Sequence, residues 1–214
     1  MKNNYFPIFA IVFSFSFSGL ADASWVLDPC MMMEGSKEPC KYKVEDKQFT
    51  ILANGNITFS NSSSPINTHV RLPAGFDIDS VRDGVLLEDS IVFNFDISDG
   101  DYGSSLVARL SLKDGTALWQ QRTPSFNSSK LLVEKNSIYV GGLGFVAKLN
   151  ALDGSILWIN SGLYERDTQA YNSFQRPKIV GPNVVFTEQK VRSAKYNGVR
   201  SIVANKVTGA IQSK

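Results

Sequence analysis

The chain has 214 residues, of which 22 are basic, 20 are acidic and one is histidine, so its formal net charge at pH 7 is +2. This near balance argues against the strongly basic face that nucleic-acid binding requires, and a single histidine excludes every multi-histidine metal site. The length suits one domain, or one array of repeats, with a sizeable hydrophobic core.

The N-terminus has the three parts of a secretory signal peptide. Lys2 supplies the positive start, residues 5–17 form an apolar run, and Ala21-Asp22-Ala23 is a small-x-small cleavage site. The run is too short for a membrane span, and no cysteine follows it closely enough to carry a lipid anchor. We therefore expect residues 1–23 to be removed and the mature protein to be periplasmic or secreted, without a membrane span.

Cys30 and Cys40 are the only cysteines, and both follow the signal peptide. An oxidising compartment favours a Cys30–Cys40 disulfide, which would close a loop of nine residues and stabilise the fold by ~2–3 kcal/mol. A redox or metal pair is the alternative, but the long separation and the lack of a nearby histidine argue against it. We assign residues 24–47 to a disulfide-containing N-terminal segment that forms a local cap.

Four segments share one short sequence motif, in which a turn with glycine joins two strand-like stretches. The turns are Asn54-Gly55, Asp114-Gly115, Asp153-Gly154 and Thr208-Gly209. Asn-Gly and Asp-Gly are strong hairpin signals because a type I′ turn needs positive φ at both central residues. The middle two copies are nearly identical, from Val107 to Trp119 and from Val146 to Trp158. A repeat of this kind indicates the architecture before local propensities are considered.

The strand-like stretches gather into four units, which in chain order span residues 48–59, 84–121, 130–160 and 178–214. No stretch after the signal peptide has helical periodicity, so we expect the fold class to be all-β. The turn glycines are 60, 39 and 55 residues apart, and a four-stranded propeller blade takes about 40–45 residues. We therefore expect residues 48–214 to form a β-propeller-like array of about four blade-like units, either closed into a ring or part of a longer propeller.

At these turns the chain resembles the PQQ-like β-propeller repeat, whose blades carry a pattern close to Ala-x-Asp-x-x-Thr-Gly-x-x-x-Trp. Thr208-Gly209 matches this pattern directly, whereas the two middle turns have Asp in place of Thr. Phe59 takes the aromatic position in the first copy, and Ser213 departs from it in the last. The resemblance implies that the tryptophans dock between neighbouring blades. It gives a structural role to Gly115, Trp119, Gly154, Trp158 and Gly209.

The resemblance implies two classes of function. Some members of the family are quinoprotein dehydrogenases with PQQ and calcium in the central channel, but those have about twice the blades expected here. Others are non-catalytic scaffolds, such as the propeller lipoprotein of the outer-membrane barrel-assembly machinery. We expect an exported, non-catalytic scaffold without a cofactor that engages a protein partner. A fragment or relative of a PQQ-dependent dehydrogenase is the alternative.

Three further motifs could carry chemistry, and for each we expect a structural role. His69 stands alone without a nucleophile motif, so we expect an ordinary strand histidine. Residues 96–103 hold three aspartates that could bind calcium, but their order is not that of an EF-hand and a solvated hairpin tip is expected. Residues 141–144 contain three glycines that could cradle phosphate, but they open no helix, so we expect a turn.

One long insertion, from Ser161 to Arg176, separates the third unit from the fourth and belongs to only one repeat. It is rich in Tyr, Phe and Arg, residue types that are enriched at the binding hot spots of protein interfaces, and functional residues commonly lie on loops. A plain solvated loop is the alternative. The candidates for partner contact are Tyr164, Arg166, Tyr171, Phe174 and Arg176.

Overall fold

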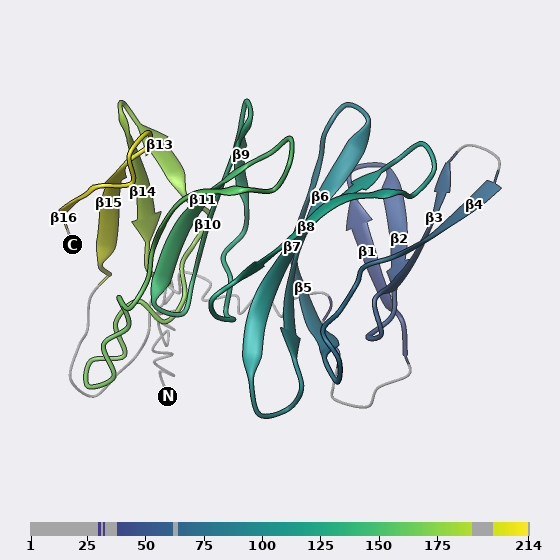
Figure 1. The fold of residues 1–214 in the computed structure, drawn as a ribbon, viewed down its shortest axis with the longest axis horizontal. Helices are drawn as coiled ribbons and strands as arrows, with labels where there is room; N and C mark the ends of the chain where they lie inside the picture. Colours follow the sequence, from purple (N-terminus) through teal and green to yellow (C-terminus); the bar gives the residue numbers. More distant parts are fainter. Residues whose placement is uncertain (1–29, 31, 33–37, 62–63, 190–198, 214) are drawn as a thin grey trace, which may run out of the picture.

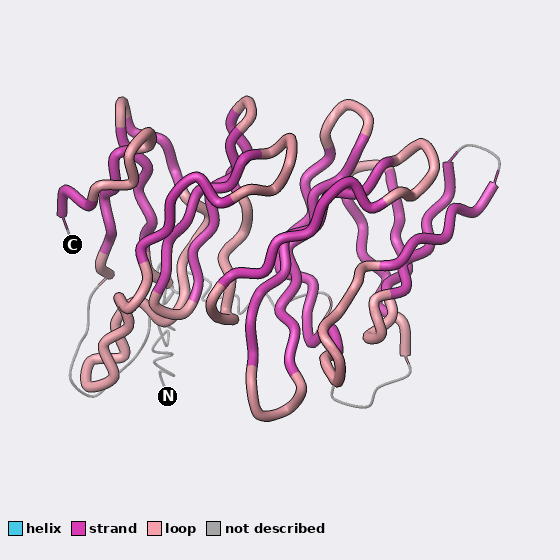
Figure 2. The backbone as a smooth tube through the Cα atoms, in the orientation of Figure 1, coloured by secondary structure: helices cyan, strands magenta, loops and turns pink. Residues whose placement is uncertain are grey.

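The structure is a computed structural model that describes residues 30, 32, 38–61, 64–189 and 199–213. These residues form sixteen strands and no helix (Figure 2). The predicted all-β fold class is therefore confirmed, whereas the signal peptide expected over residues 1–23 lies outside the described residues. Within the described ranges, no helix has the length and apolar character needed to cross a bilayer.

The strands form four antiparallel sheets of four strands each, in chain order, and each sheet is one blade (Figure 1). Blade 1 consists of β1 (Cys40–Val44), β2 (Lys47–Ile51), β3 (Asn56–Asn61) and β4 (Ser64–His69). Blade 2 consists of β5 (Asp77–Leu86), β6 (Ser90–Ser98), β7 (Gly103–Ser111) and β8 (Ala117–Thr123). Blade 3 consists of β9 (Leu132–Glu134), β10 (Ser137–Gly142), β11 (Phe145–Asn150) and β12 (Ile156–Asn160). Blade 4 consists of β13 (Lys178–Val180), β14 (Asn183–Thr187), β15 (Ser201–Asn205) and β16 (Ile211–Ser213).

The four blades stand side by side in one row, with blade 1 at the right of Figure 1 and blade 4 at the left. Three clusters of buried side chains fill the joints between blades 1 and 2, between blades 2 and 3, and between blades 3 and 4. Among the described residues, no buried cluster combines blade 1 with blade 4. The described part of the chain is therefore an open array, in which each blade packs on its neighbours in sequence.

Strand periodicity explains how one sheet can serve two joints. In β10, Ile138 and Val140 are buried against blade 2, while Tyr139 between them is buried in the joint with blade 4. Successive side chains of a strand point to opposite faces, so a blade inside the row buries both faces. In β2 of blade 1, Phe49 is buried against blade 2 and its neighbour Gln48 is exposed. A polar outer face is typical of the terminal unit in a repeat array.

The first repeat is out of phase with the other three. Asp114-Gly115, Asp153-Gly154 and Thr208-Gly209 each join the third and fourth strands of a blade, whereas Asn54-Gly55 joins the second and third. Phe59 consequently lies on β3, buried against blade 2, and does not take the tryptophan position of a fourth strand. An Asn-Gly pair predicts a hairpin turn, but it does not say which two of the four strands of a blade the turn joins. The sequence alone therefore did not reveal this difference between the first repeat and the others.

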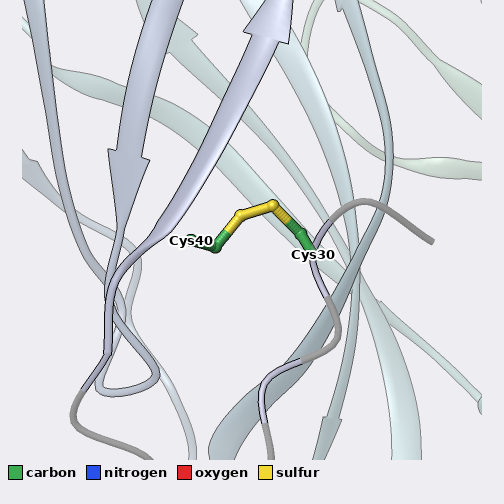
Figure 3. The surroundings of a disulfide bond; sticks show 2 residues. All are labelled: Cys30 and Cys40. Carbon is green, nitrogen blue, oxygen red and sulfur yellow. A yellow bond between two sulfur atoms is a disulfide. The ribbon is translucent and has the colours of Figure 1, made fainter. Parts of the chain in front are cut away.

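Cys30 and Cys40 form a disulfide, with their Cα atoms 5.3 Å apart (Figure 3). Cys40 is the first residue of β1, so blade 1 begins within the segment assigned to the N-terminal cap. The Cys30 carbonyl accepts a hydrogen bond from the Val81 amide (3.2 Å), and the Met32 amide donates to the Asp79 carbonyl (2.6 Å). Val81 and Asp79 belong to β5, so the disulfide joins Cys40 of blade 1 to a residue, Cys30, that is hydrogen-bonded to blade 2.

Candidate functional site

The joint between blades 2 and 3 is built around Trp119 on β8. Its indole ring packs over Gly154 in the β11–β12 turn, and its Nε1 donates a hydrogen bond to the Ala151 carbonyl (3.0 Å). Arg109 on β7 donates to the same carbonyl through Nη1 (3.0 Å). Because a carbonyl oxygen has two lone pairs, one backbone group of blade 3 accepts both donors from blade 2.

The joint between blades 3 and 4 repeats this arrangement. Trp158 on β12 packs over Gly209 and donates to the Lys206 carbonyl (3.4 Å), which also accepts a hydrogen bond from Lys148 Nζ (2.9 Å). Burial lowers the pKa of the Lys148 ammonium group. Neither Arg109 nor Lys148 was predicted as a site residue. Their shared position in the two nearly identical repeats was the signal that could have revealed them.

Among the residues that the structure describes, the joint between blades 1 and 2 has no tryptophan in this role. Gly115 packs against Ile66 and Thr68 of β4, and Thr68 Oγ1 donates a hydrogen bond to the Gly115 carbonyl. The repeat residues singled out from the sequence therefore lie at joints, where the tryptophans keep at most 9% of their surface exposed. The tryptophans pack one blade against the next, and an external ligand could not reach them.

The inserted segment between blades 3 and 4 folds back onto the core at its C-terminal end. Tyr171 and Phe174 are buried, with stacked rings whose centroids are 6.2 Å apart. Phe174 also packs edge to face on Phe186 of β14, at 6.1 Å between centroids. Tyr171 and Phe174 are therefore core residues, which corrects their prediction as partner contacts. Aromatic residues are enriched in interiors as well as interfaces, so composition alone does not distinguish the two roles.

A buried ion pair holds this insertion in place. Glu188, directly after β14, forms a bidentate pair with Arg200, with distances of 2.8 Å (Nε to Oε2) and 3.2 Å (Nη2 to Oε1). Glu188 Oε1 also accepts the Tyr171 amide (2.5 Å), and Arg200 Nη1 donates to Thr168 Oγ1 (3.2 Å). The Arg200 guanidinium lies 5.6 Å from the centroid of the Tyr171 ring. The pair therefore fixes the turn of the insertion at Thr168 and its C-terminal arm at Tyr171, although neither Glu188 nor Arg200 lies within it.

Arg176 ties the end of the insertion to blade 2. Its Nη2 lies 3.0 Å from Oδ2 of Asp83 on β5, and the same oxygen accepts the Leu131 amide (2.8 Å). Burial raises the pKa of Asp83, and the positive charge of Arg176 opposes that rise. The charge of Arg176 is therefore already paired within the molecule, which gives this candidate for partner contact a structural role.

The remaining candidates, Tyr164 and Arg166, lie on the exposed part of the insertion. Glu165 and Ala170 form an isolated antiparallel bridge, with backbone hydrogen bonds of 3.2 and 3.1 Å. The segment between them is therefore a hairpin turn. Tyr164 is half-buried against Gly144, whereas residues 165–167 are exposed. In Figure 1 this green hairpin projects at the lower left, beyond the strands of blades 3 and 4. The tip is thus the part of the insertion that a partner could reach.

The aspartate-rich hairpin of blade 2 has the predicted solvated tip at residues 99–102, but Asp96 does not belong to it. Asp96 is buried rather than solvated, and its carboxylate accepts hydrogen bonds from Ser105 Oγ (2.7 Å) and Ser128 Oγ (2.9 Å). Burial raises the pKa of Asp96, and Arg82, whose Nε lies 3.5 Å away, opposes that rise. Asp96 thus holds the segment that leads from blade 2 to blade 3. Within the described ranges, no group of three or more His, Cys, Asp or Glu side chains could hold a metal ion.

The other two motifs lie in ordinary structural positions. His69 is the last residue of β4, with its Nδ1 3.0 Å from Asn56 Oδ1 on the neighbouring strand. Of the glycine-rich residues 141–144, Gly141 and Gly142 end β10, and residues 143 and 144 form the predicted turn to β11. Neither position gathers the polar groups that a catalytic site requires.

No family model matches the chain, and no curated protein matches it. Among solved structures, BamB from Moraxella catarrhalis is similar over 81% of this chain and 47% of its own, with a TM-score of 0.52 and 14% identity. The computationally designed Ika4 protein is similar over 79% of this chain and 94% of its own, with a TM-score of 0.48 and 15% identity. AztD from Citrobacter koseri is similar over 81% and 46%, with a TM-score of 0.48 and 14% identity. The chain therefore spans about half the length of BamB.

At 14% identity, the similarity to BamB concerns the fold alone. It agrees with the four antiparallel sheets of four strands. The chain has the fold of β-propeller blades, which are here an open array of four in the described residues.

Proposed function

We propose that this protein is an exported, non-catalytic scaffold that binds a protein partner in the periplasm or cell envelope through the hairpin between blades 3 and 4. The observation that carries the proposal is the construction of this hairpin. Its C-terminal arm is anchored by buried aromatic rings and by the Glu188–Arg200 pair, its tip presents Arg166, and Tyr164 lies half-buried at its base. A preordered binding element loses less conformational entropy on association, and Tyr and Arg are frequent hot-spot residues.

Export is supported by the disulfide between Cys30 and Cys40. Disulfides persist in oxidising compartments and are rare in the cytosol. The predicted signal peptide over residues 1–23 supplies the route, because its charged start, apolar run and small-residue cleavage site are those of secreted proteins.

The alternative, a relative of the PQQ-dependent dehydrogenases, requires PQQ and calcium, and the aspartates of the β6–β7 hairpin are poor calcium ligands. Calcium needs several free carboxylate or carbonyl oxygens, yet Asp96 is already engaged by Ser105, Ser128 and Arg82. Asp99, at the exposed tip of the same hairpin, accepts the amide of Tyr102 (2.7 Å). We propose that the protein works without a cofactor. After incubation with PQQ and Ca²⁺ and gel filtration, we expect no quinone absorbance to remain with the protein, and retained absorbance would favour the dehydrogenase class.

Crosslinking in the native cell envelope tests the partner proposal. A photo-reactive residue at Arg166 should give a covalent adduct with a distinct protein, whereas the same residue at Tyr102, on the exposed β6–β7 tip, should not. In pull-downs with that protein, replacing Tyr164 and Arg166 by Ala should weaken binding by about tenfold or more, as loss of hot-spot contacts predicts. The matched control replaces Asp101 and Tyr102 by Ala. Equal binding by the two double variants would contradict the proposal.

A further inference from the structure

The buried carboxylate of Asp83 contacts segments that lead into two other blades. Asp83 is on β5 of blade 2, and its side chain keeps 6% of its surface exposed. Oδ2 accepts the Leu131 amide (2.8 Å), and both oxygens accept Arg176 Nη2, at 3.3 Å (Oδ1) and 3.0 Å (Oδ2). Gln175, next to Arg176, donates its amide to the Thr187 carbonyl of β14 (2.8 Å). The contact between Asp83 and Arg176 therefore links blade 2 to blade 4.

The attachment of Arg176 depends on one titratable group. Among the described residues, the acceptors of its guanidinium are the two oxygens of Asp83 alone, and its side chain is 51% exposed. Arg109, at the joint between blades 2 and 3, also has two uncharged acceptors, Ser90 Oγ (2.8 Å) and the Ala151 carbonyl (3.0 Å). A proton on Asp83 would remove the charge that attracts Arg176, and water could then solvate the half-exposed guanidinium.

A hydrogen-bond acceptor without a donor lies beside Asp83. Asn94 on β6 is directly opposite Asp83 in the sheet and is fully buried. Its Nδ2 donates to the Ser129 carbonyl (2.8 Å), so both side chains point toward the segment that leads to blade 3. Within the described ranges, nothing donates to Asn94 Oδ1. A carboxylate cannot donate, but a protonated carboxyl group has one O–H donor, and directly opposite side chains of an antiparallel pair can interact.

We propose that Asp83 is a proton-operated latch, which binds Arg176 when it is ionised and Asn94 when it is protonated. At neutral pH the carboxylate binds Arg176, and the entrance to blade 4 is tied to blade 2. In acid, a proton from solvent binds Oδ1, and the new O–H donates to Asn94 Oδ1, while Oδ2 continues to accept the Leu131 amide. Arg176 then turns to solvent, and blade 4 is released from blade 2 while both blades stay folded.

The charges around the latch agree with this exchange. Burial raises the pKa of Asp83, and the positive charges of Arg176 and of Lys130, an exposed residue in the segment before blade 3, oppose that rise. Arg82, the preceding residue of β5, is paired with Asp96. A hydrogen bond made only by the protonated carboxyl group favours protonation, as burial does. The latch does not rest on the proposed partner hairpin.

An NMR titration of the full exported chain tests the latch in the parent protein. The Asp83 carboxyl carbon should titrate above the usual midpoint of about 3.9. The Arg176 side-chain signals should change from those of an ordered group to those of a mobile group with the same midpoint, while the far-UV circular dichroism stays constant. A midpoint at or below about 3.9, an Arg176 signal that does not follow Asp83, or unfolding over the same range would overturn the proposal.

Asp83→Asn imitates the protonated state, because an amide can donate to Asn94 and still accept a hydrogen bond. This variant should keep the fold and leave Arg176 mobile at pH 7. The matched control is Asp89→Asn. Asp89 accepts Arg109 Nη2 (3.2 Å), but Arg109 should stay ordered because its two uncharged acceptors remain. An ordered Arg176 in Asp83→Asn, or an equal release of both arginines, would contradict the latch.

Asn94→Ala removes the proposed acceptor of the protonated form. It should lower the midpoint of the Asp83 titration by about half a pH unit or more, as expected for the loss of one hydrogen bond. Ser104→Ala is the control, since Ser104 is a buried polar residue opposite Ile97, on the face of the same sheet that packs on blade 1. An equal midpoint in the two variants would overturn the exchange of partners. If Asn94→Ala does not fold, the comparison of Asp83→Asn with Asp89→Asn decides alone.

Discussion

Replacing Gly154 by alanine perturbs only the joint between blades 2 and 3, and the structure allows the loss of unfolding free energy to be estimated. Gly154 has φ of +74°, and a Cβ there would lie 2.5 Å from Cε3 and 2.7 Å from Cδ2 of Trp119. Holding an alanine in the left-handed region costs about 1–2 kcal/mol. Displacing the packed indole adds about 1–3 kcal/mol, the usual cost of overpacking. Adding the two ranges, we expect Gly154→Ala to lower the free energy of unfolding by about 2–5 kcal/mol.

Gly75→Ala is the matched control for this substitution. Gly75 has φ of +81°, and a Cβ there would meet nothing within 4 Å. The control therefore carries only the backbone cost, about 1–2 kcal/mol. Urea titrations followed by far-UV circular dichroism give the free energy of unfolding for both variants. The difference between the two variants measures the contact between Gly154 and Trp119.

A double-mutant cycle with Trp119→Ala completes the test. Trp119→Ala alone should cost about 3–5 kcal/mol, since it removes a large buried aromatic side chain. Once the indole is gone, the alanine at position 154 meets no ring, so the two changes should be less than additive by about 1–3 kcal/mol. If Gly154→Ala and Gly75→Ala agree within about 0.5 kcal/mol, and the cycle is additive, the proposed packing of the joint is refuted.

Two further predictions concern the disulfide and the buried carboxylates. In the native exported protein, Cys30 and Cys40 should react with a thiol reagent only after reduction; labelling of the denatured, unreduced sample would contradict the bridge. Burial raises the pKa of Asp83 and Asp96, so their contribution to stability should grow as pH falls through the raised values toward about 4. Urea midpoints should therefore favour the parent over Asp96→Asn increasingly from pH 7 to about 4. A difference that shrinks on acidification would show that ion pairing with Arg82 dominates over burial.

The repeated sequence motif predicted the four sheets because each copy contains two strand-like stretches and the glycine turn that joins them. It also pointed to Trp119 and Trp158, since a residue at the same place in two repeats performs the same packing task. Arg109 and Lys148 also occupy the same place in the two repeats. Because basic side chains are most often solvated, the sequence did not predict a structural role for them. Only their hydrogen bonds to the next blade reveal that they complete the joints.

The insertion shows where sequence reasoning ends. Tyr171 and Phe174 have the residue types of an interface, but their burial depends on Phe186 and on other parts of blade 4. Glu188 and Arg200 are separated from the residues they fix, and no local pattern links their charges. Contacts of this kind arise from the path of the chain in space, which periodicity and turn signals do not encode.

The carboxylate of Asp83 has a consequence for how the array loses its structure. It lies on β5 of blade 2, accepts the Leu131 amide at the entrance to blade 3, and pairs with Arg176 at the entrance to blade 4. An array coupled only between nearest neighbours can fray from one end, unit by unit. A group on blade 2 that contacts the entrances to blades 3 and 4 opposes such fraying, because detaching blade 4 would leave the buried Asp83 carboxylate without its Arg176 partner. We therefore expect blades 2 to 4 to unfold as one cooperative unit.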